Sequence, residues 1–256
     1  MARADLWTRD QLLLALRLYM RVPFGRLHRL NPEIIQLADR LGRTPSALSM
    51  KACNFANLDP ALQARGIHGL SNLSNADRGI WNEFAANPEA FAAEAEDAAA
   101  RLAGAEVAPA DVGYEIQIPI GETEVERIVR ARRVQSFFRA AVLTTYESKC
   151  ALTGIAAPEL LTASHIIPWS ESVERRADPR NGICMNALFD RAFDRGLIAF
   201  DENLRVIVSG RLRNNMTGVR LPCSLDAIDG VELKAPNRFP PDPEAIRYHR
   251  ERVYRE

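Results

Sequence analysis

The feature that most limits the fold of this chain is a stretch rich in helix breakers, which separates two kinds of sequence. Residues 105–121 contain two prolines and two glycines, which disfavour a helix. Before this stretch apolar residues recur at helical spacing, and after it short apolar runs alternate with turns. A chain of 256 residues has room for two domains of about 100–150 residues each. We therefore expect an α+β protein with a helical domain at 1–105, a linker at 106–120 that includes a short strand at 114–118, and a second domain at 121–256.

The segments 32–41 and 45–57 predict a pair of helices joined by a short turn. Asn31 and Thr44 precede them as N-caps, and each is followed by a proline at the first helical position, where proline is favoured. Gly42 ends the first helix of the pair. This pattern of two short helices joined by a turn is typical of a helix-turn-helix unit, whose second helix often enters the major groove of DNA. The candidate DNA contacts near the start of that helix are Ser46, Ser49 and Lys51. A helical hairpin that only packs is the alternative.

The other helices are predicted from the same signals of capping, apolar spacing and breakers. Thr8 suits an N-cap, Asn87-Pro88 interrupts a helical stretch, and Gly104 ends an Ala- and Glu-rich one. Helices are therefore expected between Thr8 and Pro23, from Asn75 through Phe84, over the run at 91–104 and from Thr123 to about Tyr146.

Composition and charge exclude several classes of protein. The net charge is zero, but residues 1–80 carry +5, residues 81–124 carry −9 and residues 125–256 carry +4. The basic blocks favour an anionic partner such as nucleic acid. No apolar run approaches the roughly 20 residues that span a bilayer, and the N-terminus does not resemble a secretory signal. The four cysteines lie far apart, which indicates reduced thiols and a cytoplasmic protein without membrane partners.

The second half of the chain predicts a small domain of strands and helix. The run LLTASHII is typical of a strand and is followed by a polar loop at 170–182 and a helix-like stretch at 184–195. LIAF and LRVIV then predict two strands, with Asp201-Glu202-Asn203 as the turn between them.

This domain contains the residues best suited to chemistry. His165 follows an apolar, strand-like run and precedes Ile166-Ile167-Pro168-Trp169, and Asn181 follows in the loop. Asp190 and Asp194 are four residues apart, so they share one face of the predicted helix. A neutral histidine can take a proton from water, and carboxylate oxygens suit Mg²⁺ or Mn²⁺, so these residues could build a one-metal phosphodiesterase. The candidate phosphate ligands beside them, which could instead pair with the acidic residues, are Arg191 and Arg195. Trp169 and His249 are expected to be packing residues.

The motifs SHIIPW, NG and FDRGL follow one another here at a specific order and spacing. With them, residues 148–209 resemble the HNH endonuclease domain in its ββα-metal form. The resemblance implies that His165 is the general base and that Asn181 fixes the strand of the base by hydrogen bonds. It also implies that Asp190 and Asp194 are metal ligands.

The chain departs from the family at several positions. Ser164 stands where relatives often carry a metal-binding aspartate or histidine, and its hydroxyl is a weaker ligand. Phe189 and Asp190 stand where relatives usually have a histidine. Many relatives carry two Cys-x-x-Cys knuckles that bind a structural zinc, but Cys150 and Cys184 are each the single cysteine of such a pair. We therefore expect no structural zinc, and we expect both cysteines to be small core residues.

The resemblance implies a metal-dependent endonuclease that hydrolyses double-stranded DNA to 5′-phosphate and 3′-hydroxyl ends. One site cuts one strand, which favours a homodimer. A nuclease joined to a separate helical domain resembles modification-dependent restriction enzymes, which cut methylated foreign DNA. The alternative is an HNH-fold DNA-binding protein that no longer cuts, with Ser164 and Phe189 as its support. The aromatic residues that either form a cage for a methylated base or belong to the core are Tyr19, Phe24, Phe55 and Trp81.

Overall fold

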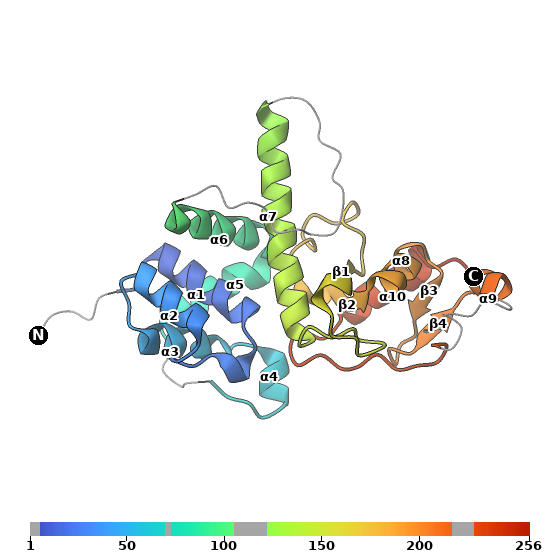
Figure 1. The fold of residues 1–256 in the computed structure, drawn as a ribbon, viewed down its shortest axis with the longest axis horizontal. Helices are drawn as coiled ribbons and strands as arrows, with labels where there is room; N and C mark the ends of the chain where they lie inside the picture. Colours follow the sequence, from blue (N-terminus) through green and yellow to red (C-terminus); the bar gives the residue numbers. More distant parts are fainter. Residues whose placement is uncertain (1–5, 70–72, 105–121, 217–227) are drawn as a thin grey trace, which may run out of the picture. The chain divides into compact units, whose positions relative to one another are not determined.

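The computed structural model describes residues 6–69, 73–104, 122–216 and 228–256. The chain divides into two compact units, Met1–Thr144 and Thr145–Glu256. The first is helical, and the second combines helices with two small antiparallel sheets in its described residues, so the fold is α+β (Figure 1). The linker and strand expected between 106 and 120 lie outside the described residues. In the part of the chain that the structure covers, no helix is both long and apolar enough to cross a membrane.

The helices of the first unit follow the predicted caps and breakers. Thr8 forms a capping box with Gln11, and the side chains of Asn31 and Thr44 each accept a hydrogen bond from a first-turn amide. Gly104 ends its helix in the left-handed conformation, with φ of 64°. The bounds are α1 (Arg9–Arg21), α2 (Pro32–Arg40), α3 (Pro45–Phe55), α4 (Pro60–Ala64), α5 (Asn75–Ala86), α6 (Pro88–Ala103) and α7 (Glu122–Thr145), with a 3₁₀ turn at Phe24–Arg26. α4 was not predicted, because five residues are too short to show a helical period.

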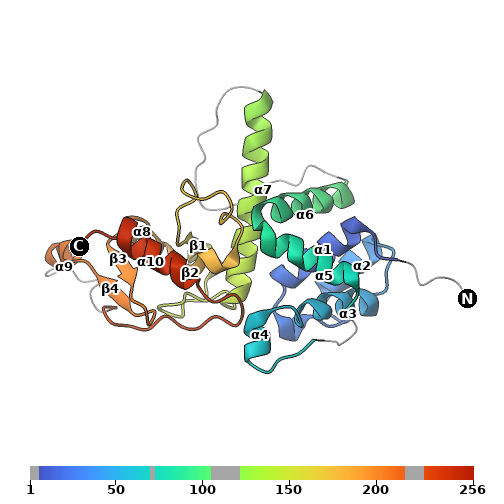
Figure 2. The same ribbon diagram turned by 180° about the vertical axis from the view of Figure 1, so that it is seen from behind.

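An aromatic cluster forms the core of the first unit. Around it α1 contacts α3, α5 and α6, and Figures 1 and 2 show the arrangement of these helices. The rings of Tyr19, Phe55 and Trp81 lie 6.1–6.4 Å apart between centroids. The hydroxyl of Tyr19 donates to the buried carboxylate of Asp59 at 2.7 Å. Three of the four aromatic residues considered as a cage are therefore core residues, and the fourth, Phe24, is half-buried.

The long helix α7 packs within the first unit, although the sequence suggested that it belongs to the second. The ring of Phe137 lies 6.4 Å from Phe84 and 5.9 Å from Phe91, and Arg133 forms an ion pair with Asp97. Phe137 is fully buried. Its apolar face completes the N-terminal core, and this is the physical reason why the unit extends to residue 144 rather than ending near 105.

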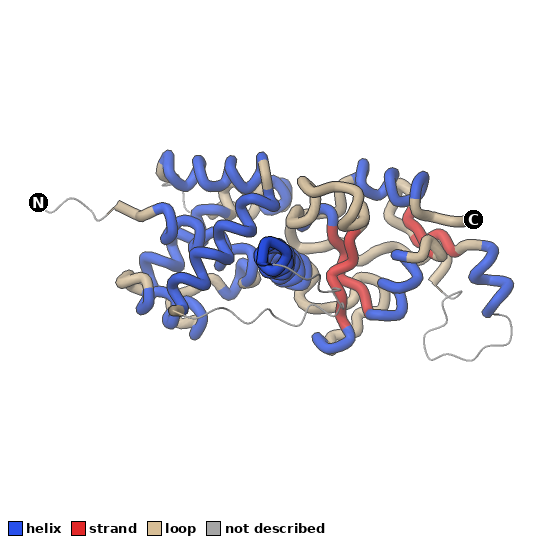
Figure 3. Tube along the Cα trace, turned by 90° about the horizontal axis from the view of Figure 1, so that it is seen from above, coloured by secondary structure: helices blue, strands red, loops and turns tan. Residues whose placement is uncertain are grey.

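The second unit is built around two paired strands and a helix. Its elements are β1 (Leu161–His165), β2 (Gly182–Asn186), α8 (Ala187–Asp194), β3 (Ile198–Phe200), β4 (Val206–Val208), α9 (Gly210–Met216) and α10 (Pro243–Arg252), with 3₁₀ turns at Pro158–Leu160 and Pro179–Asn181. β1 pairs antiparallel with β2 and places His165 opposite Gly182. Figure 3 shows the paired strands in red. α8 contacts β1, β2 and β3.

Part of the stretch that the sequence predicted as a helix is a strand. Residues 182–186 form β2, and only those from 187 onward form α8. β2 is buried along its whole length, so its side chains form a continuous apolar run that does not alternate. Such a run looks the same in a buried strand and a buried helix. Cys150 and Cys184 are both fully buried, as expected of small core residues.

The C-terminal helix α10 packs against β3 and α8 through one stacked pair. The ring of His249 lies parallel to that of Phe193 at 3.6 Å, and its Nε2 lies 3.1 Å from the carbonyl oxygen of Phe193. Gly196 has a φ of 68°, and a Cβ there would lie 2.1 Å from the carbonyl oxygen of Val253. The close approach of the chain after α10 therefore requires glycine at this position.

Candidate active site

His165 lies at the end of β1 with one ring nitrogen held by the backbone. Its Nε2 lies 3.0 Å from the carbonyl oxygen of Arg176. A carbonyl oxygen only accepts, so this contact assigns the proton to Nε2 and the lone pair to Nδ1. Withdrawal of the ring from water lowers the pKa of His165 to about 4, although the Arg176 carbonyl acts in the opposite direction. The imidazole is therefore neutral near pH 7, which is the form that can accept a proton.

Trp169 and Arg176 enclose this histidine, and the sequence did not reveal that role for either residue. The Trp169 ring meets His165 edge to face, with centroids 5.6 Å apart at 81°. The guanidinium of Arg176 lies 4.7 Å from the centroid of the Trp169 ring, and its Nε donates to the Trp169 carbonyl at 2.9 Å. Trp169 is half-buried. No local signal marks an arginine in a polar loop for such a place, because the contact forms only when the loop folds back.

Asn181 closes the loop between β1 and β2. Its side-chain oxygen accepts from the Ile167 amide at 2.8 Å, and its Nδ2 donates to the carbonyls of Ile167 and Arg175 at 3.1 and 3.2 Å. Its own carbonyl accepts from the Ile166 amide at 2.9 Å. Asn181 is fully buried. These contacts hold the residues that follow His165, which is the positioning role that the family resemblance implies.

One ion pair anchors the same loop to the start of α10, and another lies within the loop. Arg175 lies 2.5 Å from the carboxylate of Asp242, the N-cap of that helix. Asp178 accepts hydrogen bonds from the side chain of Arg180 at 2.9 and 3.0 Å. The loop that carries the Arg176 carbonyl is therefore tied down on both sides of that residue.

Ser164 and Asp190 meet in the interior of the unit, between β1 and α8. The Ser164 hydroxyl donates to the Asp190 carboxylate at 2.5 Å, and both residues are buried. Asp194 lies one helical turn further along α8 and is exposed. Although the residue is exposed, neighbouring protein atoms remove part of the hydration of its carboxyl group, and this loss together with the charge of Asp190 raises the pKa of Asp194 to about 6. The two carboxylates are therefore close enough to repel each other.

The chemistry of this donor set fits a hard divalent cation. Carboxylate and hydroxyl oxygens are the ligands that Mg²⁺ and Mn²⁺ prefer, and a cation relieves the repulsion between Asp190 and Asp194. The set is small, because the described residues contain no group of three or more His, Cys, Asp or Glu side chains placed to hold a metal. Phe189 does not add to it, since its side chain is fully buried in the core. Water would have to supply the remaining ligands.

The two predicted phosphate ligands, one on α8 and one directly after it, lie at the surface. Arg191 and Arg195 are exposed, and their charges lower the pKa of Asp194 in opposition to the raising effects. They therefore lie near the acidic residues of the site, and a role in binding phosphate stays a prediction.

The candidate DNA contacts on α3 mostly have partners inside the first unit. The Ser49 hydroxyl is buried and donates to the Leu27 carbonyl at 2.8 Å, so in this conformation it does not reach a DNA groove. Lys51 lies 2.7 Å from the fully buried carboxylate of Asp77. Ser46 alone of the three is exposed. In this helix pair, Ser49 and Lys51 of the second helix therefore bond to groups of the first unit itself.

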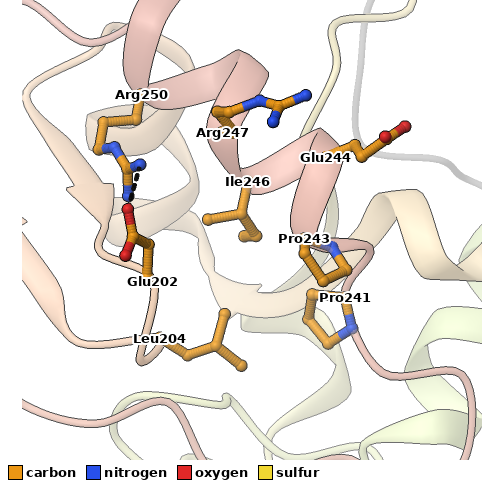
Figure 4. Close-up of a pocket in the computed structure, with 8 residues that line it drawn as sticks. All are labelled: Glu202, Leu204, Pro241, Pro243, Glu244, Ile246, Arg247 and Arg250. Atoms are coloured by element: carbon orange, nitrogen blue, oxygen red, sulfur yellow. Dashed lines mark hydrogen bonds and ion pairs between the residues drawn. The ribbon is translucent and has the colours of Figure 1, made fainter.

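A cavity of about 340 Å³ in the second unit lies between the turn after β3 and the start of α10 (Figure 4). Leu204 and Ile246 form its apolar wall, and Arg250 faces Glu202 at 3.3 Å on one side. None of the predicted site residues lines it. This cavity is therefore separate from the group of residues around His165.

Comparison with known proteins agrees with the geometry around β1, β2 and α8. The model of the HNH endonuclease family matches residues 150–201. No curated protein was found to match the chain. The matched segment contains His165, Asn181, Asp190 and Asp194. The second unit therefore carries an HNH endonuclease domain, and the chain is a nuclease that hydrolyses phosphodiester bonds.

Proposed function

We propose that the second unit cuts DNA with His165 as the general base. The observation that carries this proposal is the contact between His165 Nε2 and the Arg176 carbonyl, which leaves the lone pair on Nδ1. Nδ1 takes a proton from a water molecule, the water oxygen bonds to phosphorus, and the bond from phosphorus to the 3′ oxygen breaks. The products carry a 5′-phosphate and, once the leaving oxygen is protonated, a 3′-hydroxyl.

The other residues of the site have supporting roles in this proposal. Asn181 holds the loop that positions the base, and Arg191 and Arg195 bind the phosphate that is cut. Asp190 and Asp194, with Ser164, would hold Mg²⁺ or Mn²⁺. HNH nucleases are generally dependent on a divalent metal, and such an ion supplies charge stabilisation at the phosphate.

We further propose that the chain is a restriction enzyme of the cytoplasm that cuts double-stranded DNA, with methylated DNA as the candidate target. The support is its layout, in which a helical unit that contains a helix-turn-helix-like pair precedes the nuclease unit. The cysteines among the described residues are free thiols, in keeping with a reducing compartment. Each chain offers one reaction site, so cutting both strands calls for a homodimer.

A plasmid-nicking assay tests this function directly. Supercoiled plasmid prepared from methylating and from non-methylating hosts is incubated with the protein in Mg²⁺, Mn²⁺ or EDTA. We expect metal-dependent nicking that falls by about 10²–10⁴-fold in His165→Ala, the usual loss for a general base. His28→Ala, at an exposed position in the first unit, is the matched control and should cut like wild type. DNA binding without any cutting by wild type would favour the alternative of a binding protein with an inactive HNH fold.

A further inference from the structure

A polar cavity of about 170 Å³ lies in the first unit, between α1 and α2. Arg17 and Arg21 from α1 and Arg40 from α2 contribute three guanidinium groups to its lining, together with Glu33 and Gln36. These residues have no part in the reaction site, which belongs to the other unit. Three cations around one small cavity need an explanation, because like charges repel.

The acidic side chains near this cavity do not supply hydrogen-bond acceptors for all three guanidinium groups. Arg17 binds the buried carboxylate of Glu96 through two hydrogen bonds of 2.8 and 3.0 Å. Arg21 lies 3.9 Å from the same carboxylate, which is too far for a hydrogen bond. The Nη1 atom of Arg21 is buried and has no hydrogen-bond partner among the described residues. One carboxylate therefore serves two guanidinium groups, and only that of Arg17 is well bound.

The charges around Arg21 do not fully compensate its guanidinium, so a further anion would stabilise it. Burial lowers its pKa, the neighbouring Arg17 lowers it further, and Glu96 and Glu33 only partly compensate. A buried N–H without an acceptor is unfavourable, and buried donors in proteins almost always have a partner. Arg40 is exposed on α2 at the edge of the same cavity, where it can reach a ligand that enters from solvent.

We propose that this cavity binds a phosphate group, with the solvent-exposed part of the Arg21 guanidinium, whose side chain is 33% exposed, as the inner donor and Arg40 as the outer one. Guanidinium groups match the geometry and charge of phosphate oxygens. The cavity is smaller than the roughly 300–1,000 Å³ of sites that enclose drug-sized ligands, so it suits a phosphate group alone and not a whole nucleotide. The phosphate is either free in solution or part of a DNA backbone, and the DNA source rests on the proposed function.

The first arm of the test uses inorganic phosphate and the full-length protein. Phosphate is titrated against the side-chain Nε–H signals of arginine in an ¹⁵N NMR spectrum, for wild type and for Arg21→Gln, Arg40→Gln and Arg78→Gln. Arg78 is exposed on α5, outside the cavity, so this control loses the same charge elsewhere. We expect the two cavity variants to bind phosphate about tenfold more weakly, as the loss of a charge-assisted hydrogen bond predicts, and the control to bind like wild type. Arg40→Gln changes an exposed residue and so remains informative if Arg21→Gln does not fold.

The second arm uses a duplex DNA in EDTA, where binding is followed by fluorescence anisotropy at several salt concentrations. If the phosphate is part of DNA, each cavity variant lowers the slope of log K against log salt by about 1. If the phosphate is free, the slope is unchanged and only the first arm responds. The proposal is overturned if wild type binds no phosphate in either arm, or if Arg78→Gln loses as much binding as the cavity variants. Plasmid cutting is measured separately, so a protein that binds phosphate but does not cut would reject the proposed function and retain this inference.

Discussion

At the scale of single residues, the reaction site depends on how one imidazole is held. The Arg176 carbonyl determines which nitrogen of His165 carries the proton, and the Trp169 ring covers one side of the histidine. Both contacts come from a loop that Asn181 closes through four hydrogen bonds. The chemistry assigned to His165 therefore requires the loop as much as the histidine itself.

The metal ligands give a prediction at this scale. Asp190→Asn removes one of two carboxylates, so binding of Mn²⁺ should weaken by at least about tenfold, because a charged carboxylate binds a hard cation more strongly than a neutral amide does. Calorimetry with Mn²⁺ measures the affinity. Asp39→Asn, at an exposed position on α2, is the control and should bind Mn²⁺ like wild type. Equal affinity in Asp190→Asn and wild type would place the metal elsewhere.

At the scale of elements, the packing of α10 against α8 makes stability depend on pH. Burial lowers the pKa of His249 to about 4, against about 6.5 for an unfolded histidine. As the pH falls, the unfolded state therefore takes up a proton at a higher pH than the folded state does. The stability that the neutral His249 contributes is complete above about pH 6.5 and is lost as the pH falls toward 4. The expected loss from this residue is about 2 kcal/mol between pH 7 and pH 5.

Urea unfolding of wild type and His249→Phe at both pH values checks this prediction. The variant keeps an aromatic ring over Phe193 but cannot be protonated, so its stability should fall less on acidification. His165 also has a lowered pKa and acts in the same direction in both proteins, which is why the comparison isolates His249. An identical acid loss in the two proteins would contradict the assignment.

The turn between α8 and β3 gives a second prediction for an element. In Gly196→Ala, a methyl group would meet the Val253 carbonyl at 2.1 Å on a backbone with positive φ, so the segment after α10 must move. We expect a loss of about 1–3 kcal/mol of stability, measured by thermal unfolding. Gly210→Ala at the start of α9 meets no atom within 4 Å and should unfold close to the wild-type temperature. A Gly196→Ala protein as stable as this control would show that the close approach is absent in solution.

At the scale of the whole molecule, the division into Met1–Thr144 and Thr145–Glu256 predicts which fragments of the protein fold by themselves. A fragment of residues 145–256 should nick plasmid without preference for methylated DNA, since it lacks the unit proposed to select the target. A fragment of residues 121–256 includes α7 without the core that buries Phe137, so it should expose apolar surface and aggregate. Light scattering and plasmid nicking of both fragments test this. A 145–256 fragment that keeps full selectivity would remove the recognition role from the first unit.

Local sequence signals were enough to predict where the capped helices of the first unit begin, although not the short helix α4, and to name the candidates for chemistry in the second unit. Thr8, Asn31 and Thr44 cap the helices that they were predicted to cap, because capping is a local interaction. The motifs around His165 and Asn181 indicated an HNH nuclease, which the family match confirms for residues 150–201. Such signals are readable from sequence because they depend on neighbours in the chain.

Features that depend on contacts between distant segments became visible only in the folded protein. The tertiary structure placed α7 in the first unit through Phe137 and assigned β2 to a strand by pairing it with β1. It gave Ser49 and Lys51 partners inside the first unit, and it brought the Arg176 carbonyl to His165. None of these contacts has a periodic or local signature, because each partner is chosen by the packing of the whole unit and not by the residues beside it.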